Sequence, residues 1–281
     1  MSDFEVLSEQ RCFDGVQGFY RFPSEACNGP MRFAVFTPPG DAGRKFPVLF
    51  YLAGLTCTEE TFVIKAGAQR LAAQLGLMLV APDTSPRGQG IDGEDEDWDF
   101  GTGAGFYIDA TEAPWSGAYR MESHVTSELP GIIADNFPAD LSRVGIFGHS
   151  MGGHGALTLH LKHRELFKSV SAFAPISAPI SCPWGEKAFS NYLGAERDVW
   201  RRHDASELVR TNPSEAHILV DQGLADPFLE RELHPHLLEQ AASEAGQKLT
   251  LRRHEGYDHS YFFIQSFIED HLRHHAGALA A

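Results

Sequence analysis

The sequence has few cysteines, no long apolar run and a shortage of positive charge, and each lack excludes a class of protein. Its four cysteines are widely spaced and include no C-x-x-C pair, so we expect free thiols and no disulfide framework. No apolar stretch reaches the roughly 18 residues that a transmembrane helix needs, so no membrane partner is expected. The net charge is −15, from 23 Lys and Arg against 38 Asp and Glu. Nucleic acids and anionic membranes bind clustered cations, so neither is an expected partner.

Two further absences concern location and metal binding. The first ten residues carry acids where a signal peptide would carry basic and then apolar residues, so we expect a cytoplasmic protein. The chain has 14 histidines, but it contains no H-E-x-x-H motif and no His/Cys cluster at zinc spacing. The glycine-rich segment 101–105 lacks a following Lys-Ser/Thr and follows no predicted strand, which argues against a phosphate loop. We therefore expect no metal and no cofactor.

The sequence does contain many hydrophobic residues, and they fall in short apolar runs that alternate with stretches typical of helices. The 281 residues are 43% hydrophobic and include 20 Phe, enough for one or two domains. Short apolar runs predict strands over 31–37, 48–53, 77–81, 143–147, 170–174, 217–220 and 248–252. The stretches between them predict helices over 59–75, 123–136, 152–163, 227–245 and 260–274. Strands that alternate with helices indicate an α/β fold with a mostly parallel sheet.

Two long segments do not fit this alternation. Residues 82–115 and 178–203 are expected to be irregular, and each follows a predicted strand. In a parallel sheet the loops after the strands form the site, so both should contribute to it. The acidic run 92–97 is expected to be a solvated face, with Trp98 and Phe100 packed against the cleft.

One motif carries chemistry. Residues 148–152 read Gly-His-Ser-Met-Gly, a G-x-S-x-G sequence placed between an apolar strand and a predicted helix. In this setting the serine, Ser150, lies on a tight turn that projects its Oγ above the sheet edge, and the flanking glycines allow close backbone packing. The pattern therefore predicts that Ser150 is a nucleophile. The alternative is a glycine-rich turn that binds nothing.

A nucleophile elbow is followed along the chain by an acid and then by a histidine. Asp226 lies in a loop after the predicted strand 217–220, and we favour it as the acid because the loop gives it reach. Asp221, at the end of that strand, is the competing candidate. A purely structural role for Asp226, capping the helix that Pro227 begins, is the alternative interpretation.

The predicted base is His259, in a loop just before the last helix. Its Nε2 would take the proton of Ser150 while Asp226 fixes the tautomer. His254 is expected in strand or loop, and His149 and His154 flank the nucleophile, where packing or substrate contact suits them better than base catalysis. Three further histidines are expected at a solvated helix end: His271, His274 and His275.

An oxyanion hole needs two backbone N–H groups. The residue after the nucleophile, Met151, supplies one, and the loop after the strand 48–53 should supply the other. Gly54 permits an unusual turn there, so the N–H of Leu55 is the expected second donor. Because one ordered triad spans residues 150–259, we expect a single domain over 1–281.

The longer motifs resemble one family. They are GLTCTEE (54–60), APDTSPRG (81–88), DFGTGAGFYIDAT (99–111), FGHSMGGHGAL (147–157), SAFAPI (171–176), CPWGEKAFSNYLG (182–194), DQG (221–223) and GYDHSY (256–261). In this order they are similar to the S-formylglutathione hydrolase family, also called esterase D. The resemblance implies the α/β-hydrolase fold, and a cytosolic, often dimeric serine thioesterase that needs no cofactor. Such an enzyme cleaves S-formylglutathione to formate and glutathione, the last step of glutathione-dependent formaldehyde removal, and hydrolyses small activated esters.

The resemblance also assigns residues. It implies Ser150, Asp226 and His259 as the triad, and Leu55 and Met151 as the oxyanion donors. It further places a reagent-sensitive thiol, Cys57, near the active site and Trp184 in the substrate cleft. In the loop that carries the acid, this chain reads Ala-Asp-Pro where the family commonly has two acids and no proline.

Several alternatives stay open. A general carboxylesterase or acyltransferase on the same fold is one, and a catalytically silent binding protein is another. Cys57 is a conceivable second nucleophile or a steric or redox gate, although Ser150 already has the elbow. The anionic substrate conflicts with the charge of −15 unless local cations focus the cleft, and the candidates are Lys65, Arg87 and Lys187.

Overall fold

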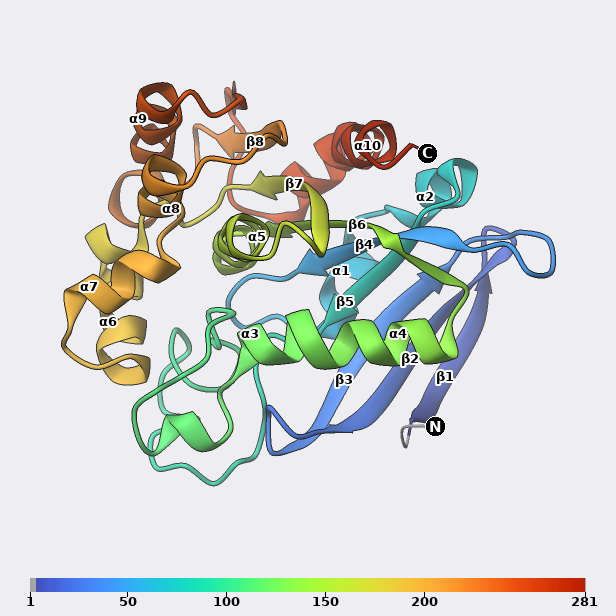
Figure 1. Ribbon diagram of the computed structural model, residues 1–281, viewed down its shortest axis with the longest axis horizontal. Helices are drawn as coiled ribbons and strands as arrows, with labels where there is room; N and C mark the ends of the chain where they lie inside the picture. The colour runs from blue at the N-terminus through green and yellow to red at the C-terminus, as the bar shows by residue number, and fades with distance from the viewer. Residues whose placement is uncertain (1–3, 281) are drawn as a thin grey trace.

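A nine-stranded sheet runs through the computed structural model, which describes residues 4–280 (Figure 1). Its strands are β1 (Glu5–Cys12), β2 (Gly15–Ser24), β3 (Gly29–Thr37), β4 (Phe46–Leu52), β5 (Met78–Pro82), β6 (Ala139–His149), β7 (Phe167–Phe173), β8 (Ile218–Gly223) and β9 (Leu249–His254). Their order across the sheet is β1-β2-β3-β5-β4-β6-β7-β8-β9. From β5 to β9 every neighbouring pair is parallel, and from β1 to β5 every pair is antiparallel. The predicted mostly parallel α/β architecture is confirmed.

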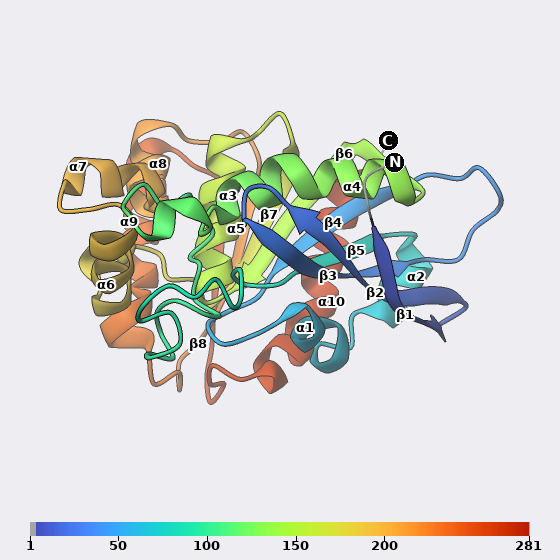
Figure 2. The ribbon, with the colours of Figure 1, turned by 90° about the horizontal axis from the view of Figure 1, so that it is seen from below.

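Helices cover both faces of the sheet. They are α1 (Glu59–Lys65), α2 (Gln69–Leu75), α3 (Met121–Ser123), α4 (Leu129–Asn136), α5 (Met151–Lys162), α6 (Pro183–Tyr192), α7 (Arg197–Trp200), α8 (Ala205–Thr211), α9 (Pro235–Ala245) and α10 (Tyr261–Ala278). Short 3₁₀ turns lie at Trp115–Gly117, Pro179–Ser181 and Arg201–His203, and π turns at His124–Glu128 and Leu229–Leu233. Figure 2 shows α3 and α4 on one side of the sheet and α1 and α10 on the other. Within residues 4–280, no helix is both long and apolar enough to cross a membrane.

All seven predicted strands form, and the two strands β1 and β2 were missed. β1 is an edge strand, and no residue of it is fully buried. Its sequence, EVLSEQRC, therefore contains no continuous apolar run of the kind that marks the central strands. Strands that are exposed on a sheet edge carry a weaker hydrophobic signal than strands covered on both faces.

Three of the predicted helices are interrupted or displaced. The expected helix 59–75 breaks into α1 and α2 around Gly67, whose φ of +68° is left-handed. The expected helix 227–245 begins as a π turn and restarts at α9 after His234, which has a φ of +46°. The expected helix 123–136 starts earlier than predicted, because helical backbone already begins at Met121 and the Ser123 N–H donates to Asp109. In each case local contacts and turns, and not the hydrophobic period, set the boundary.

The segments expected to be irregular are more ordered than predicted. Residues 178–203 contain α6 and α7, so the expectation of a loop is wrong there. The acidic run is not wholly solvated, because Glu94 is buried and accepts hydrogen bonds from the Tyr119 hydroxyl and the Gly90 N–H. Trp98 borders the cavity around Ser150, as expected, whereas Phe100 does not line it but is buried against Trp115 and Tyr192.

Of the three C-terminal histidines two are buried and one is half-buried, which contradicts the expected solvated helix end. Helix α10 extends to Ala278 and packs against β7. His271 Nδ1 and His275 Nε2 both bond to the Ser171 hydroxyl, at 2.8 and 2.9 Å, and both rings are fully buried. His274 is half-buried and its Nε2 donates to the Val170 carbonyl. Tertiary packing of α10 on the sheet removes from solvent a face that looks polar in the sequence.

Candidate active site

Ser150 lies at the junction of β6 and α5, in a strained conformation. Its φ is +58° and its ψ is −119°, a region that few non-glycine residues adopt. The turn is fixed by backbone bonds, since the Ser150 N–H donates to the Phe173 carbonyl and the Ser150 carbonyl accepts from Ile176 and His154. The Ser150 side chain does not cap α5. Its Oγ is therefore available for chemistry.

The two glycines of the motif make this turn possible. A Cβ on Gly152 would lie 1.9 Å from the Leu52 carbonyl oxygen, and a Cβ on Gly148 would lie 2.2 Å from the Gly152 carbonyl oxygen. Only glycine allows β4, β6 and α5 to approach so closely. This close packing holds Ser150 at the C-terminal edge of the sheet.

The loop after β4 passes directly over Ser150. A Cβ on Gly54 would lie 3.2 Å from the Ser150 Cβ, so Leu55 follows at close range. Neither the Leu55 N–H nor the Met151 N–H donates to a backbone acceptor within residues 4–280. The Met151 N–H lies at the start of α5, where the helix dipole favours negative charge. Two free donors next to the serine are what an oxyanion hole requires.

The long segment after β5 braces that loop. The Thr56 N–H donates to the Gly103 carbonyl at 3.0 Å, and the Tyr107 hydroxyl donates to the Ala53 carbonyl at 2.9 Å. Thr56 itself has a φ of +66°, which the loop tolerates because it is tied at both ends. The glycine-rich stretch 101–105 thus supports the neighbourhood of Ser150.

Asp226 and His259 are brought together from two loops. His259 Nδ1 lies 2.5 Å from Asp226 Oδ2, while Asp226 Oδ1 accepts the Phe228 N–H at 2.8 Å. The two loops are joined by their backbones, since the Ala225 N–H donates to the Tyr257 carbonyl. The Asp226 side chain is fully buried and that of His259 is 16% exposed. This geometry fixes the His259 tautomer with its proton on Nδ1 and leaves Nε2 free to act as a base.

Ser150 and His259 line one cavity of about 210 Å³, although no hydrogen bond joins them in the described residues. Free enzymes often show long catalytic hydrogen bonds that tighten when substrate binds. The cavity is largely aromatic and apolar, which strengthens electrostatic interactions inside it. Its lining comprises Gly54, Leu55, Cys57, Trp98, His149, Ser150, Trp184, Phe228, His259 and Tyr261.

His259 is held between two rings. Phe228 meets it edge-on with ring centroids 5.0 Å apart, and the His149 ring lies 4.4 Å away on another side. Burial and the nearby His259 lower the pKa of His149 well below its usual range, so this ring is neutral. Neither nitrogen of His149 has a hydrogen-bond partner within residues 4–280. His149 thus packs against His259, which is one of the two roles that the sequence left open for it.

The other expected cleft residues also border the cavity. The Cys57 thiol is half-buried, and burial raises its pKa, which does not favour a reactive thiolate. Trp184 lies against Trp98, with centroids 5.7 Å apart, and against Phe228 at 4.8 Å. Phe228 and Tyr261 were not singled out in the sequence, although each follows a triad candidate by two positions.

Asp221, the competing acid, takes no part in this cavity. Its carboxylate accepts two hydrogen bonds from Arg252, both at 2.6 Å, and lies 3.2 Å from His271 Nε2. Burial raises the pKa of Asp221, but the bonds from His271 and Arg252 outweigh burial and hold it well below its usual range. Asp221 is a buried structural anion. Within residues 4–280 no group of three or more metal-ligating side chains occurs.

Two of the three cations expected to focus the cleft are engaged elsewhere. Arg87 donates twice to Asp83, at 2.7 and 2.8 Å, and Lys187 Nζ lies between Asp97 and Asp99 at 2.8 and 2.6 Å. Lys65 Nζ lies 5.8 Å from the centroid of the Tyr261 ring. Arg87 and Lys187 therefore bring little uncompensated charge to the cavity.

Comparison with known proteins gives a consistent picture. The sequence model of the Esterase family matches residues 24–274. An S-formylglutathione hydrolase of Paracoccus denitrificans is 51% identical over 98% of each chain, and one of Mus musculus is 52% identical, also over 98% of each. The solved structure of an S-formylglutathione hydrolase from Agrobacterium tumefaciens has a TM-score of 0.96 and 51% identity, covering 98% of this chain and 100% of the other. A ferulic acid esterase structure at 18% identity, with a TM-score of 0.72, shares the fold.

Proposed function

Because the chain belongs to the S-formylglutathione hydrolase family, we propose that it hydrolyses S-formylglutathione to formate and glutathione through an acyl-enzyme on Ser150. The observation that carries the site assignment is the hydrogen bond between Asp226 and His259. His259 lines the same cavity as Ser150, whose backbone is strained and whose side chain does not cap α5. Fold, family and site chemistry agree on one reaction class.

The first half-reaction forms the acyl-enzyme. Ser150 Oγ attacks the formyl carbon while His259 Nε2 takes the hydroxyl proton. The negative charge that develops on the carbonyl oxygen is held by the N–H groups of Leu55 and Met151. The C–S bond then breaks, and His259 returns the proton to the leaving sulfur, which departs as glutathione.

The second half-reaction releases formate. Water takes the place of the thiol, and His259 Nε2 removes its proton as its oxygen attacks the formyl ester of Ser150. The ester bond to Ser150 Oγ breaks, Oγ regains the proton, and formate leaves. Asp226 stays ionised throughout and stabilises the imidazolium.

The neutral ring of His149 suits this scheme. A second cationic imidazole 4.4 Å from His259 would disfavour the imidazolium that the base must form. The low pKa of His149, which follows from burial and from His259, keeps that position uncharged. Cys57 and Trp184 are proposed to shape the substrate cleft without taking part in bond making.

A steady-state comparison tests the substrate. The purified enzyme should show a kcat/KM for S-formylglutathione at least about a hundredfold above that for 4-nitrophenyl acetate, since the thioester is the evolved substrate. Similar values for the two substrates would favour the alternative, a general small-acyl carboxylesterase. Failure of a fluorophosphonate probe to label the protein would instead point to a silent binding protein.

We further propose that the enzyme is a single-domain, cytoplasmic homodimer that takes part in formaldehyde removal. One continuous sheet supports the single domain, four unpaired cysteines suit a reducing compartment, and the family resemblance supports the dimer. Light scattering should give twice the chain mass of 31.0 kDa, and a mass of one chain would refute the dimer.

A further inference from the structure

A second cavity of about 500 Å³, here called the outer cavity, adjoins the cavity around Ser150. The two share three aromatic side chains, so the outer cavity lies within reach of a ligand whose reacting group is at Ser150. Its size falls in the ordinary range of small-molecule sites, about 300–1,000 Å³. It is lined by Trp98, Asp99, Pro183, Trp184, Lys187, Pro227, Phe228, Arg231 and Glu232.

Most charges of the outer cavity are already compensated. Lys187 is held by Asp97 and Asp99. Glu232 is buried, and its Oε2 accepts the N–H of Trp184 at 3.0 Å, so this carboxylate anchors the start of α6. The remaining charged group is Arg231.

Arg231 is the available cation of this cavity. Its side chain is 77% exposed, and its one ion pair within residues 4–280 is a 3.4 Å contact from Nε to Glu232 Oε1. The N–H groups of Nη1 and Nη2 therefore remain available to donate hydrogen bonds to a ligand. A guanidinium that meets a carboxylate only through Nε, and whose two Nη atoms have no partner within residues 4–280, suits bidentate binding of a carboxylate.

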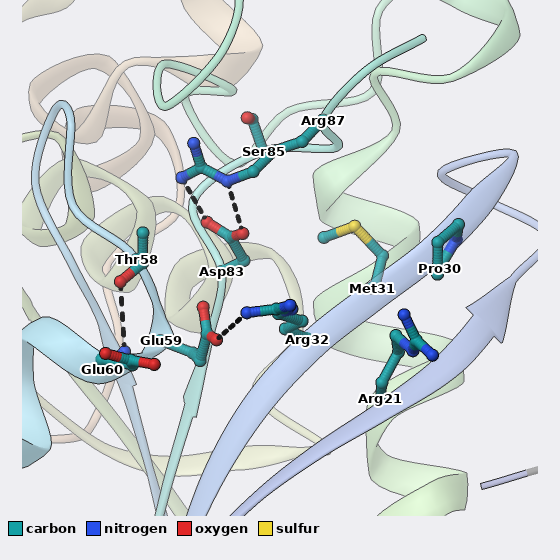
Figure 3. A pocket seen from close by; sticks show the side chains of 10 residues that line it. All are labelled: Arg21, Pro30, Met31, Arg32, Thr58, Glu59, Glu60, Asp83, Ser85 and Arg87. Atoms are coloured by element: carbon teal, nitrogen blue, oxygen red, sulfur yellow. Dashed lines mark hydrogen bonds and ion pairs between the residues drawn. The ribbon is translucent and has the colours of Figure 1, made fainter. Parts of the chain in front are cut away.

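The cavity drawn in Figure 3 is the competing location, and it is less suitable. It has about the same volume but shares no lining residue with the cavity around Ser150. Its arginines have partners: Arg87 is bound to Asp83 by two hydrogen bonds, Arg32 faces Glu59 at 3.8 Å, and Arg21 bonds Glu5, which is not drawn. A ligand there would be separated from the reacting serine.

We propose that the outer cavity is the subsite for the thiol leaving group and that Arg231 binds one of its carboxylates. The inference rests on the proposed function, since glutathione carries two carboxylates and one ammonium group. The aromatic rings between the cavities cover the apolar part of the thiol, and Arg231 supplies the cation that the net charge of −15 otherwise denies an anionic substrate. Arg231 thereby determines specificity for charged over uncharged thioesters and esters.

Two substitutions at this position test the proposal. In Arg231→Ala, the KM for S-formylglutathione should rise about two- to fivefold, the effect expected from losing one exposed ion pair, with little change in kcat. In Arg231→Glu the rise should be larger, because repulsion replaces attraction. For both variants, the ratio of kcat/KM for S-formylglutathione to kcat/KM for 4-nitrophenyl acetate should fall.

Matched controls separate this local effect from others. Arg273→Glu, on α10, makes the same change in net charge at an exposed site that does not line either cavity, and should leave the ratio unchanged. Arg32→Gln tests the cavity of Figure 3 and should also leave it unchanged. If Arg231→Glu leaves the ratio unchanged, or if Arg32→Gln lowers it instead, the proposal is wrong. If the wild-type enzyme does not hydrolyse S-formylglutathione, the proposed function itself has failed.

Discussion

Two buried aspartates, five positions apart, illustrate how single residues divide the work in this enzyme. Asp226 points to His259, and the Gln222 side chain approaches it at 3.4 Å. Asp221 is surrounded by the Arg252 guanidinium and by His271. One carboxylate orients His259, and the other is buried and pairs with the half-buried Arg252, which also bonds Asp270 on α10.

The two aspartates should respond differently to the same substitution. Asp226→Asn should lower kcat for S-formylglutathione by about 10²–10⁴-fold, because an amide favours the wrong His259 tautomer, and should barely change unfolding. Asp221→Asn should lower the free energy of unfolding by about 1–3 kcal/mol, because it removes the charge-assisted hydrogen bonds that a buried carboxylate accepts from Arg252, which keeps its contact with Asp270. Kinetics and urea unfolding of both variants provide the measurement. A larger loss of kcat in Asp221→Asn than in Asp226→Asn would reverse the assignment.

Residue types and their order along the chain were enough to select the proposed triad. Ser150, Asp226 and His259 stand out because strand, turn and helix signals surround each of them. The role proposed for Arg231 could not be found in this way, because it depends on which charged side chains the fold brings into contact. The sequence offered Lys187 equally well, and only the contacts with Asp97 and Asp99 remove it.

At the scale of elements, the site depends on how closely α5 approaches β4. Gly152, in the first turn of α5, lies against the Leu52 carbonyl at the end of β4. The contact sets the height of the Ser150 turn above the sheet and places the start of α5 beside the loop that carries Leu55. Helix and strand therefore position both proposed oxyanion donors.

A pair of glycine substitutions tests this contact. Gly152→Ala should lower the free energy of unfolding by about 1–3 kcal/mol or more, since its Cβ would overlap the Leu52 carbonyl. Gly131→Ala, on the exposed face of α4 where an added Cβ would meet no atom within 4 Å, should raise it by about 0.5–1 kcal/mol. Urea unfolding measures both. Equal stability of the two variants would show that α5 can shift without cost.

Hydrophobic runs predicted the central strands because both faces of β4 to β8 are covered. The same signal failed for the exposed edge strand β1, and it could not place the break at Gly67 or the left-handed His234. Helix period describes which face is apolar, whereas the end of a helix depends on the conformation of one or two residues.

At the scale of the whole molecule, buried histidines link stability to pH. His160, on α5, donates from Nδ1 to the Phe167 carbonyl and accepts at Nε2 from the Ser214 hydroxyl, an arrangement that satisfies the neutral ring. Burial lowers its pKa to about 4. The unfolded chain binds a proton at His160 near pH 6.5 and the folded chain does not, so folding is favoured at higher pH.

This linkage gives a measurable slope. The contribution of neutral His160 should be fully present above pH 6.5 and should decline by about 3 kcal/mol as the pH falls to 4. In His160→Gln, the free energy of unfolding should be lower at pH 7.5 but should fall less steeply between pH 6.5 and 4.5. Urea titrations at several pH values test this, and parallel pH profiles for the two proteins would contradict it.

The net charge of −15 excluded nucleic acid and anionic membranes as expected partners, but it did not by itself exclude an anionic substrate. The proposed outer subsite addresses the conflict locally, because Arg231 keeps open donors at a cavity whose lining holds two cations and two anions. The net charge of the protein therefore affects how charged partners approach from a distance, whereas the choice of substrate depends on a few contacts next to Ser150.

The most direct test of the account is the rate at which Ser150→Ala hydrolyses S-formylglutathione. The variant should retain less than about a thousandth of the wild-type kcat, because the acyl-enzyme cannot form without Oγ. Its unfolding transition should stay cooperative, which separates loss of chemistry from loss of fold. A folded Ser150→Ala protein that keeps more than about a thousandth of the wild-type rate would contradict the proposed serine mechanism.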